Sequence, residues 1–250
     1  MIYFKDIFDR AFNLFDDPDL SQRYYYDQAG FQKDMLDYLI IGKNKFMSPV
    51  AITDKLLQMD DPKGFFIGDN GDGSQEYDLG TYGDEEGDNA SNLPCNGGEG
   101  CGFSFSINGK YVPGRYYTKE IDGKLHGFVD FYQPVETTDK WSFAWFYAGA
   151  FTADFSDCLR SDFPMSALMD KVINILAYAT LSAWGDKEVG RVIEVRNVLT
   201  DTDFKMYAPA NSARAKVEWR NQMNKDMDTL VSELNWRILS TPKGGSRFGK

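Results

Sequence analysis

The sequence predicts an α+β protein in which a frame of helices carries an inserted antiparallel β domain. Apolar residues recur at three- and four-residue steps near both ends of the chain and in residues 163–184, and this is the spacing of amphipathic helices. Residues 102–155 instead alternate aromatic and polar side chains. They also contain one Asn-Gly and one Asp-Gly pair, which are strong β-hairpin signals.

The central segment 163–184, FPMSALMDKVINILAYATLSAW, has the longest apolar stripe of the chain. Pro164 suits a first helical turn, because the amide hydrogen that it lacks would be unpaired there. Gly185 follows the last apolar residue and is expected to cap the helix. We expect the other helices to pack against this one.

Further helices are predicted on both sides of the central one. Residues 2–15 have near-helical apolar spacing and end at the sequence DDP, since the residue before a proline disfavours the α conformation. A second helical pattern starts near Leu20 or Asp27 and continues to about Phe46. Residues 52–57 allow either a short helix or a strand.

The chain after the central helix is also expected to be mostly helical. Residues 189–195 favour helix slightly over strand. A long final helix is predicted from about Ala210 to Ile238, with an apolar face and a charged face. The tail LSTPKGGSRFGK is rich in Gly, Ser and Pro and is expected to be flexible.

Charge is distributed unevenly along the chain, whose net charge is -11. Eleven acidic residues and one basic residue, Lys63, lie between Asp60 and Glu99, and Gly and Asp dominate up to Cys101. This stretch predicts a long loop. The last fifteen residues contain four basic residues and no acidic one. An acidic block combined with a basic tail argues against a general nucleic-acid binder.

Four segments between residues 102 and 155 have strand-like patterns: GFSFSI, YYTKEI, KLHGFVDFY and WSFAWFYAGAFTADF. They predict at least four antiparallel strands in a meander. The simplest interpretation of their aromatic residues is sheet core, with an interface as the alternative. We therefore expect residues 1–58 and 157–239 to form one helical domain, residues 59–156 to form an acidic loop and β insertion, and residues 240–250 to form the tail.

The sequence contains no strong catalytic pattern. Its single histidine, His126, lies in a predicted strand, where a structural role is expected, and no G-x-S-x-G motif is present. Cys95 and Cys101 bracket CNGGEGC, but a zinc site needs four ligands and Cys158 is distant in sequence. A small disulfide loop stays open as an alternative, although an odd number of cysteines favours a reducing compartment.

Cofactor and membrane binding are not predicted. The sequence DNGDGSQEYD at residues 69–78 resembles a calcium loop, yet Gly71 occupies a position where an EF-hand requires an acid or Asn. A solvated acidic loop is favoured, with a divalent cation as the weaker alternative. No apolar run is long enough to cross a bilayer, and MIYFKDIFDR lacks an apolar signal-peptide core.

Three segments together carry a family resemblance: YYYDQAGFQKDMLDYLIIGKNKFMSP, MDKVINILAYATLSAW and DTDFKMYAPANSARAKVEWRNQMNKDMDTLVSELNWRI. In this order they resemble the head–tail connector (adaptor or neck ring) proteins of tailed bacteriophages, especially those of crAss-like podoviruses. The similarity covers roughly residues 20–50 and 160–240. Residues 60–160 have no counterpart in a minimal connector.

The resemblance implies a structural virion protein and not an enzyme. Connectors form a ring, often twelve-fold, between the portal protein and other tail or ring proteins. DNA passes through this ring without sequence-specific binding. The resemblance therefore places the protein at the head–tail junction of the virion, after assembly in the cytoplasm of the bacterial host.

Two sets of candidate site residues follow. The C-terminal end of a connector commonly docks on the portal, which gives a docking set of Trp236, Arg237, Lys243, Arg247, Phe248 and Lys250. An acidic loop could line the channel or attract a cation, which gives an acidic set of Asp69, Asp72, Glu76, Asp78, Asp84, Glu85, Glu86 and Asp88.

Two other classes of function remain open. One is a virion binding module that presents the aromatic β domain to a glycan or to another tail protein. The other is a hydrolase that uses carboxylates and a bound cation, although no carboxylate pair stands out.

Overall fold

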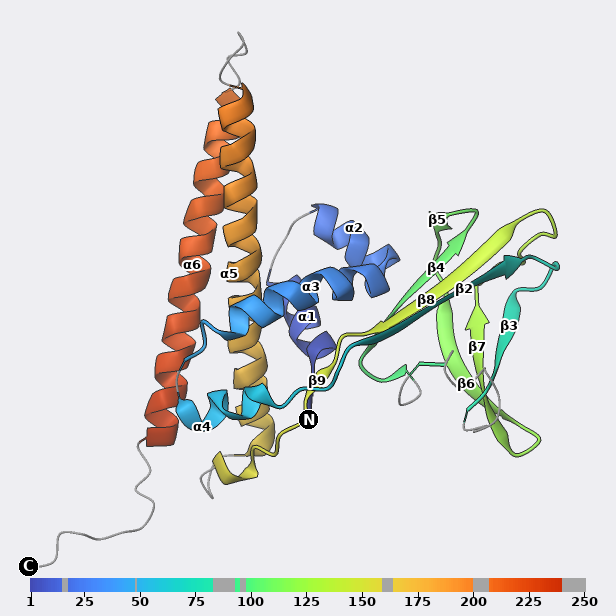
Figure 1. The fold of residues 1–250 in the computed structure, drawn as a ribbon, viewed down its shortest axis with the longest axis horizontal. Helices are drawn as coiled ribbons and strands as arrows, with labels where there is room; N and C mark the ends of the chain where they lie inside the picture. Colours follow the sequence, from blue (N-terminus) through green and yellow to red (C-terminus); the bar gives the residue numbers. More distant parts are fainter. Residues whose placement is uncertain are drawn as a thin grey trace, which may run out of the picture. The chain divides into compact units, whose positions relative to one another are not determined.

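The computed structural model describes residues 1–14, 18–47, 49–82, 93–94, 98–158, 164–199 and 207–239. These residues confirm the α+β fold, with helices and antiparallel sheets (Figure 1). The helices are α1 (Phe4–Asn13), α2 (Pro18–Tyr26), α3 (Gln28–Lys43), α4 (Val50–Thr53), α5 (Met165–Leu199) and α6 (Tyr207–Leu239), with 3-10 turns η1 (Lys55–Leu57) and η4 (Ser156–Cys158). The strands are β1 (Ile2–Tyr3), β2 (Lys63–Asn70), β3 (Glu76–Thr81), β4 (Cys101–Ile107), β5 (Lys110–Tyr111), β6 (Arg115–Ile121), β7 (Lys124–Asp130), β8 (Lys140–Tyr147) and β9 (Ala150–Phe151).

The chain divides into two compact units. The helical unit comprises Met1–Ile2, Asp37–Met59 and Phe151–Lys250, and the β unit comprises Tyr3–Leu36 and Asp60–Ala150. These boundaries differ from the expected helical domain of residues 1–58 and 157–239, because Tyr3–Leu36 belongs to the β unit.

Contacts at the start of α3 explain that difference. Ser104 on β4 accepts a hydrogen bond from the backbone N–H of Ala29 (3.0 Å) and donates one to Asp27 (2.8 Å). A Cβ atom on Gly102 would lie 2.7 Å from the carbonyl oxygen of Gln28, so only glycine permits this approach. The N-terminal helices are therefore held on the β sheet, through contacts that are distant in sequence.

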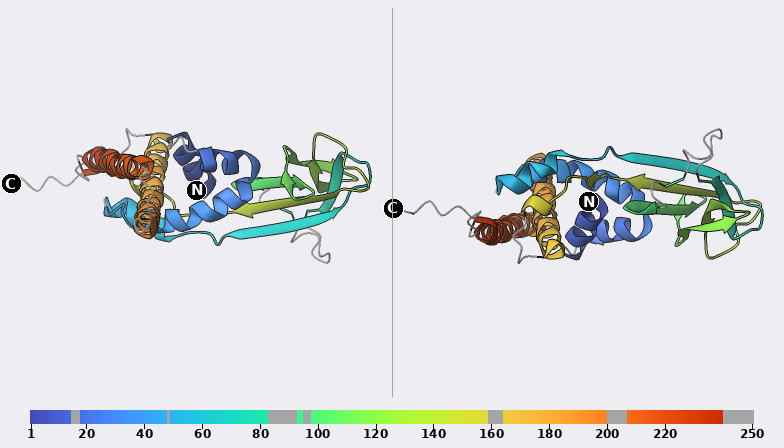
Figure 2. Two further views of the ribbon diagram at one scale, coloured as in Figure 1. Left: turned by 90° about the horizontal axis from the view of Figure 1, so that it is seen from above. Right: turned by 90° about the horizontal axis from the view of Figure 1, so that it is seen from below.

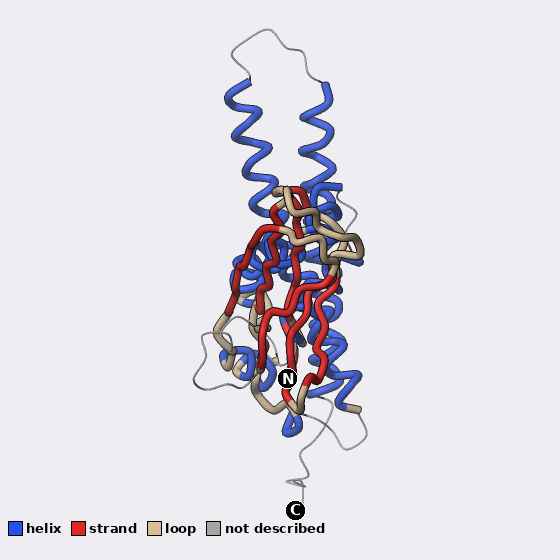
Figure 3. Tube along the Cα trace, turned by 90° about the vertical axis from the view of Figure 1, so that its right-hand side faces the viewer, coloured by secondary structure: helices blue, strands red, loops and turns tan. Residues whose placement is uncertain are grey.

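The helical unit is built on two long helices that run side by side, α5 and α6 (Figure 1, Figure 3). Gly185 does not cap α5, which continues to Leu199 and includes residues 189–195. A Cβ atom on Gly185 would lie 3.0 Å from the Trp219 ring, so this glycine allows α6 to approach closely. The prediction of a cap was wrong because the reason for the glycine lies on another helix.

The end of α3 also packs on α5, as expected for the other helices. A Cβ atom on Gly42 would lie 2.5 Å from the carbonyl oxygen of Ala179. Residues 52–57, for which helix and strand were both open, form α4 and η1. Among the described residues, no helix is long and apolar enough to cross a membrane.

The β unit contains two sheets whose inner faces share one aromatic core. Their strand orders are β2-β8-β4-β5 and β3-β7-β6. Tyr77 from one sheet lies 4.7 Å from Trp141 of the other between ring centroids, and Tyr116 stacks on Phe143 at 5.8 Å. The buried core comprises Leu79, Leu93, Cys101, Phe105, Val129, Phe131, Val135, Trp141, Phe143, Trp145, Tyr147 and Ala150.

Both predicted hairpin turns are confirmed, but the meander is wrong. Asn108-Gly109 joins β4 to β5 and Asp122-Gly123 joins β6 to β7, with positive φ at all four residues. However, β8 lies between β2 and β4, so these three neighbouring strands are not consecutive in sequence. The predicted loop after Asp60 also contains β2 and β3.

Candidate functional site

Residues 40–59 of the helical unit carry an unusual number of exposed apolar side chains. Met47 is 76% exposed and Leu57 is 72% exposed. The same segment buries Phe46, Ile52 and Leu56, so it has an inner and an outer apolar side. We call the exposed set the outer α4 residues, after the helix near its centre, although only Val50 lies on α4 itself. The set comprises Ile40, Ile41, Met47, Val50, Leu57 and Met59. Clusters of exposed apolar residues commonly mark protein–protein contacts.

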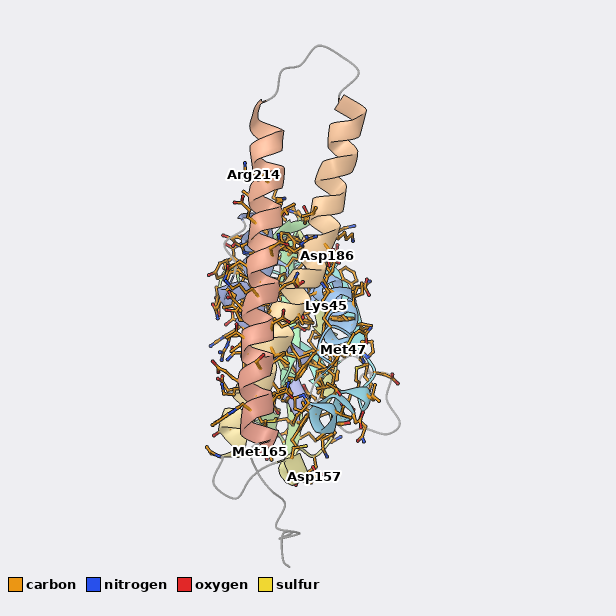
Figure 4. All side chains as sticks on the ribbon, turned by 90° about the vertical axis from the view of Figure 1, so that its left-hand side faces the viewer. Lys45, Met47, Asp157, Met165, Asp186 and Arg214 are labelled. Atoms are coloured by element: carbon orange, nitrogen blue, oxygen red, sulfur yellow. The ribbon has the colours of Figure 1, made fainter. Side chains whose placement is uncertain are left out.

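Two lysines fix this segment to the rest of the helical unit. Lys45 Nζ lies 2.7 Å from Ser182 Oγ and 2.7 Å from Asp186 Oδ2 on α5 (Figure 4). Lys55 Nζ lies 2.7 Å from Asp157 Oδ1, and this hydrogen bond holds the pKa of Asp157 below its usual range. The outer α4 residues therefore project from an anchored backbone.

α6 adds one more exposed apolar side chain near its end, because Trp236 is 74% exposed. Trp236 belongs to the predicted docking set. Arg237 lies on α6, but its side chain is outside the described part of the structure. Lys243, Arg247, Phe248 and Lys250 also lie outside the described residues, so the structure does not bring the docking set together.

The described members of the acidic set lie on strands and a turn. Asp69 is on β2, Asp72 is in the turn after it, and Glu76 and Asp78 are on β3. Hydrogen bonds from Ser74 lower the pKa of Asp72. No group of three or more His, Cys, Asp or Glu residues among the described positions could hold a metal ion. The other members lie outside the described residues: Asp84, Glu85, Glu86 and Asp88.

The histidine and two of the cysteines lie among residues of the folded units and contact or pack against them. His126 is on β7, with Nδ1 2.8 Å from Asp78 Oδ2. Cys101 is buried in β4, whereas Cys95 lies outside the described residues, so the predicted disulfide alternative also falls outside them. The Cys158 thiol contacts the carbonyl oxygen of Ala51 (3.3 Å), and burial together with Asp157 raises its pKa to about 11. A thiol with so high a pKa is a poor nucleophile.

The β unit contains a groove of about 410 Å³ that sequence reasoning did not identify. The end of α2 supplies Tyr24, Tyr25 and Tyr26, and β4 and β6 supply Phe103 and Arg115 among other residues. The YYY sequence lies at the end of a helix. No feature of the neighbouring sequence indicates that this helix faces β4. This aromatic groove combines aromatic rings with polar groups such as Gln28 and Arg115, a mixture that suits a small ligand.

Neighbouring residues fix the groove walls. Tyr24 stacks on Phe12 with ring centroids 3.9 Å apart and donates a hydrogen bond to Asp9 (3.0 Å). Arg115 donates to Asp130 (2.9 Å), so its charge is balanced by a carboxylate outside the groove lining. Tyr25 remains 70% exposed and is available for stacking. A rigid, locally neutral groove favours an uncharged ligand.

No protein-family model, no curated protein and no solved structure matches the chain.

Proposed function

We propose that this chain is a structural subunit of a bacteriophage virion. In this proposal, copies of the chain form a ring at the head–tail junction, between the portal and the tail. The observation that carries the proposal is the outer α4 residues, since they place several exposed apolar side chains within residues 40–59 of a helical unit of connector-like sequence. A closed ring requires such heterologous contacts on every copy.

Charge supports the same proposal. The β unit contains 23 acidic and 10 basic residues, whereas the helical unit contains 15 acidic and 17 basic residues. An acidic surface repels phosphates, so DNA could pass it without being retained. The almost balanced helical unit suits contacts with protein neighbours, including the portal.

The proposal is tested by the mass of the protein, measured by mass photometry alone and with a candidate portal protein. We expect a ring, either alone or with the portal. Changing Met47, Val50 and Leu57 together to Ser should reduce the ring population at least tenfold, because all three side chains are largely exposed and serve contacts and not folding.

The matched control changes two exposed apolar residues of the β unit, Leu125 and Tyr132, to Ser. This control should leave the ring population unchanged. A wild-type chain that forms no ring, with or without the portal, would overturn the proposal. Equal loss in the triple variant and the control would remove the role of the outer α4 residues.

The aromatic groove favours a second candidate function, in which the protein is a virion module that binds a neutral glycan. Pyranose rings stack on tyrosine faces, and Gln28 and Arg115 line the groove as hydrogen-bond donors. Glycan screening of the full chain tests this candidate. Changing Tyr25 and Tyr26 to Ala should abolish any binding, whereas Leu125→Ala should not; a full chain that binds no glycan contradicts the candidate.

A further inference from the structure

One edge of the larger sheet of the β unit is long and open. β2 pairs with β8 over all eight residues from Lys63 to Asn70, and no described strand pairs with its other side. In both views of Figure 2, β2 (teal) lies at the margin of the strands. Open edges of this length attract other strands, and proteins normally protect them.

The opposite edge of the same sheet is closed. There β5 contributes only the two residues Lys110 and Tyr111, and Asp27 forms an isolated bridge to Ser104 on β4. The start of α3 then covers Gly102. Among the described residues, β2 is therefore the edge strand of this sheet that is long enough to pair with a further strand.

The hydrogen-bonding groups on the open edge can be assigned. The backbone N–H of Gly71 donates to the carbonyl of Asp139 (2.8 Å), in register with the β2–β8 ladder. In an antiparallel pair, alternate residues direct both backbone groups to the same neighbour. Odd-numbered residues of β2 therefore bond to β8, and Gly64, Phe66 and Gly68 direct their N–H and C=O groups outward.

The outer face of β2 has a bulky centre between two glycines, and the Phe146 ring of β8 already lies against Gly64, where a Cβ atom would be 2.9 Å from it. Phe66 is 68% exposed, and it stands between Gly64 and Gly68, which have no side chains. A groove of about 460 Å³ adjoins it, lined in part by Phe66, Gly68 and Ser142. An aromatic ring placed over an edge glycine stabilises a strand pair.

We propose that β2 pairs antiparallel with β2 of a second copy of this chain, across a two-fold axis at Phe66. Residues directly opposite each other in a continued sheet must share a face, so their numbers must have the same parity. Centred on Phe66, this register places Lys63 opposite Asp69 of the second copy, twice by symmetry. It also places Gly64 opposite Gly68, and Phe65 opposite Ile67.

This register is complementary at every position. Opposite charges meet at both ends and apolar residues meet in the middle, where the two Phe66 residues lie opposite each other and diagonal to the glycines of the second copy. Because the other sheet edge is closed, association through β2 stops at two copies and yields one eight-stranded sheet. The inference does not rest on the proposed function, since ring contacts were assigned to the helical unit and this contact involves the β unit alone.

Charge reversal tests the register. Sedimentation of the full chain with Met47, Val50 and Leu57 changed to Ser, which removes the proposed ring contacts, should show a species of twice 28.4 kDa. Lys63→Glu and Asp69→Lys should each weaken the pairing at least tenfold, because each variant places like charges opposite each other at both ends. The double variant should restore pairing. A monomeric wild-type chain, or single variants that pair as well as the wild type, would overturn the proposal.

Cross-linking gives an independent test of the centre. Only at the two-fold axis does a residue lie directly opposite its own copy, so a single Phe66→Cys substitution should form a disulfide-linked dimer under mild oxidation. Asn70→Cys is the matched control, because Asn70 is an exposed residue of the same strand and face but lies opposite no copy of itself. Equal cross-linking at both positions would refute the register. Triple substitution of the outer α4 residues should leave this dimer intact, so the two proposals fail separately.

Discussion

The two units differ in how they fill their interiors. The helical unit buries small residues, including Ala177, Ala179 and Ala183, together with rings such as Phe46 and Trp184. The β unit buries large rings, including Trp141, Phe143 and Trp145. Backbone spacing accounts for the difference, because closely packed helices leave room only for small side chains, whereas two sheets pack about 10 Å apart.

The same comparison applies to charge. The helical unit is nearly balanced, and ion pairs such as Lys171 of α5 with Glu233 of α6 (3.1 Å) link different elements. The β unit has an excess of 13 acidic residues over basic ones. Stability of the helical unit should therefore depend mainly on close backbone contact. Stability of the β unit should depend on its aromatic core and on how its carboxylates are paired.

The largest expected effect is in the β unit. Phe143→Ala removes a fully buried ring that contacts Phe103, Phe105 and Tyr116, and should cost about 4 kcal/mol of unfolding free energy. Urea unfolding followed by near-ultraviolet and by helical circular dichroism should show an earlier aromatic transition and an unchanged helical one. A joint shift of both transitions would show that the units do not unfold separately.

The next effect distinguishes the helical unit. Gly42→Ala places a Cβ atom 2.5 Å from the carbonyl oxygen of Ala179, a backbone atom that cannot move aside, and should cost about 2 to 3 kcal/mol. Gly190→Ala on α5 is the control, since a Cβ atom there meets nothing within 4 Å. It should stabilise the unit by up to about 1 kcal/mol in thermal unfolding. Effects of the same sign would contradict the role assigned to backbone contact.

A smaller effect tests carboxylate pairing in the β unit. Burial alone would raise the pKa of Asp130, but donors from Gln75, the Tyr132 backbone and Arg115 outweigh it and hold the pKa below its usual value. The carboxylate therefore stabilises the fold above its unfolded-state pKa, and this contribution disappears as pH falls through the lower folded-state pKa.

Asp130→Asn should accordingly cost about 2 kcal/mol at pH 7 and less in acid. Urea unfolding at pH 7 and at pH 3 measures this difference. A penalty that is the same at both pH values would show that packing, and not charge, explains the effect.

The smallest effect concerns the lysine that anchors the outer α4 residues. Lys45→Met breaks the contact with Asp186, but both side chains are partly exposed, so about 1 kcal/mol is expected. Part of this loss should vanish in concentrated salt, because screening already weakens the pair in the wild type. A loss as large as that of Gly42→Ala would show that ion pairs stabilise the helical unit as strongly as close backbone contact does.

Local sequence patterns correctly predicted those helices and turns that depend only on neighbouring residues. The apolar periodicity of α5 and α6 and the two Gly-containing turns all appear where expected. β2 and β3 were missed because their partners, β8 and β7, lie far along the chain, and because Gly and Asp hide the alternation around Phe65 and Ile67. The interior Gly185 failed as a cap for the same reason, since Trp219 determines its role.

The candidate sites were less predictable than the fold. Sequence shows that Met47, Val50 and Leu57 are apolar, but only the fold shows that Phe46 and Ile52 fill the interior and leave those three outside. The aromatic groove likewise requires α2 to lie beside β4. Of the predicted docking set, Trp236 alone has a described side chain, so most of that set stays a prediction.

The lengths of the paired helices α5 and α6 are also constrained by their contact with each other. With 35 and 33 residues, they extend about 52 Å and 50 Å at 1.5 Å per residue. Seven extra residues in each helix would lengthen the pair by about 10 Å and turn its faces by only about 20°. Two extra residues would rotate the same faces by about 200° and separate Gly185 from Trp219. Lengths of related proteins should therefore differ in these two helices by steps of one heptad.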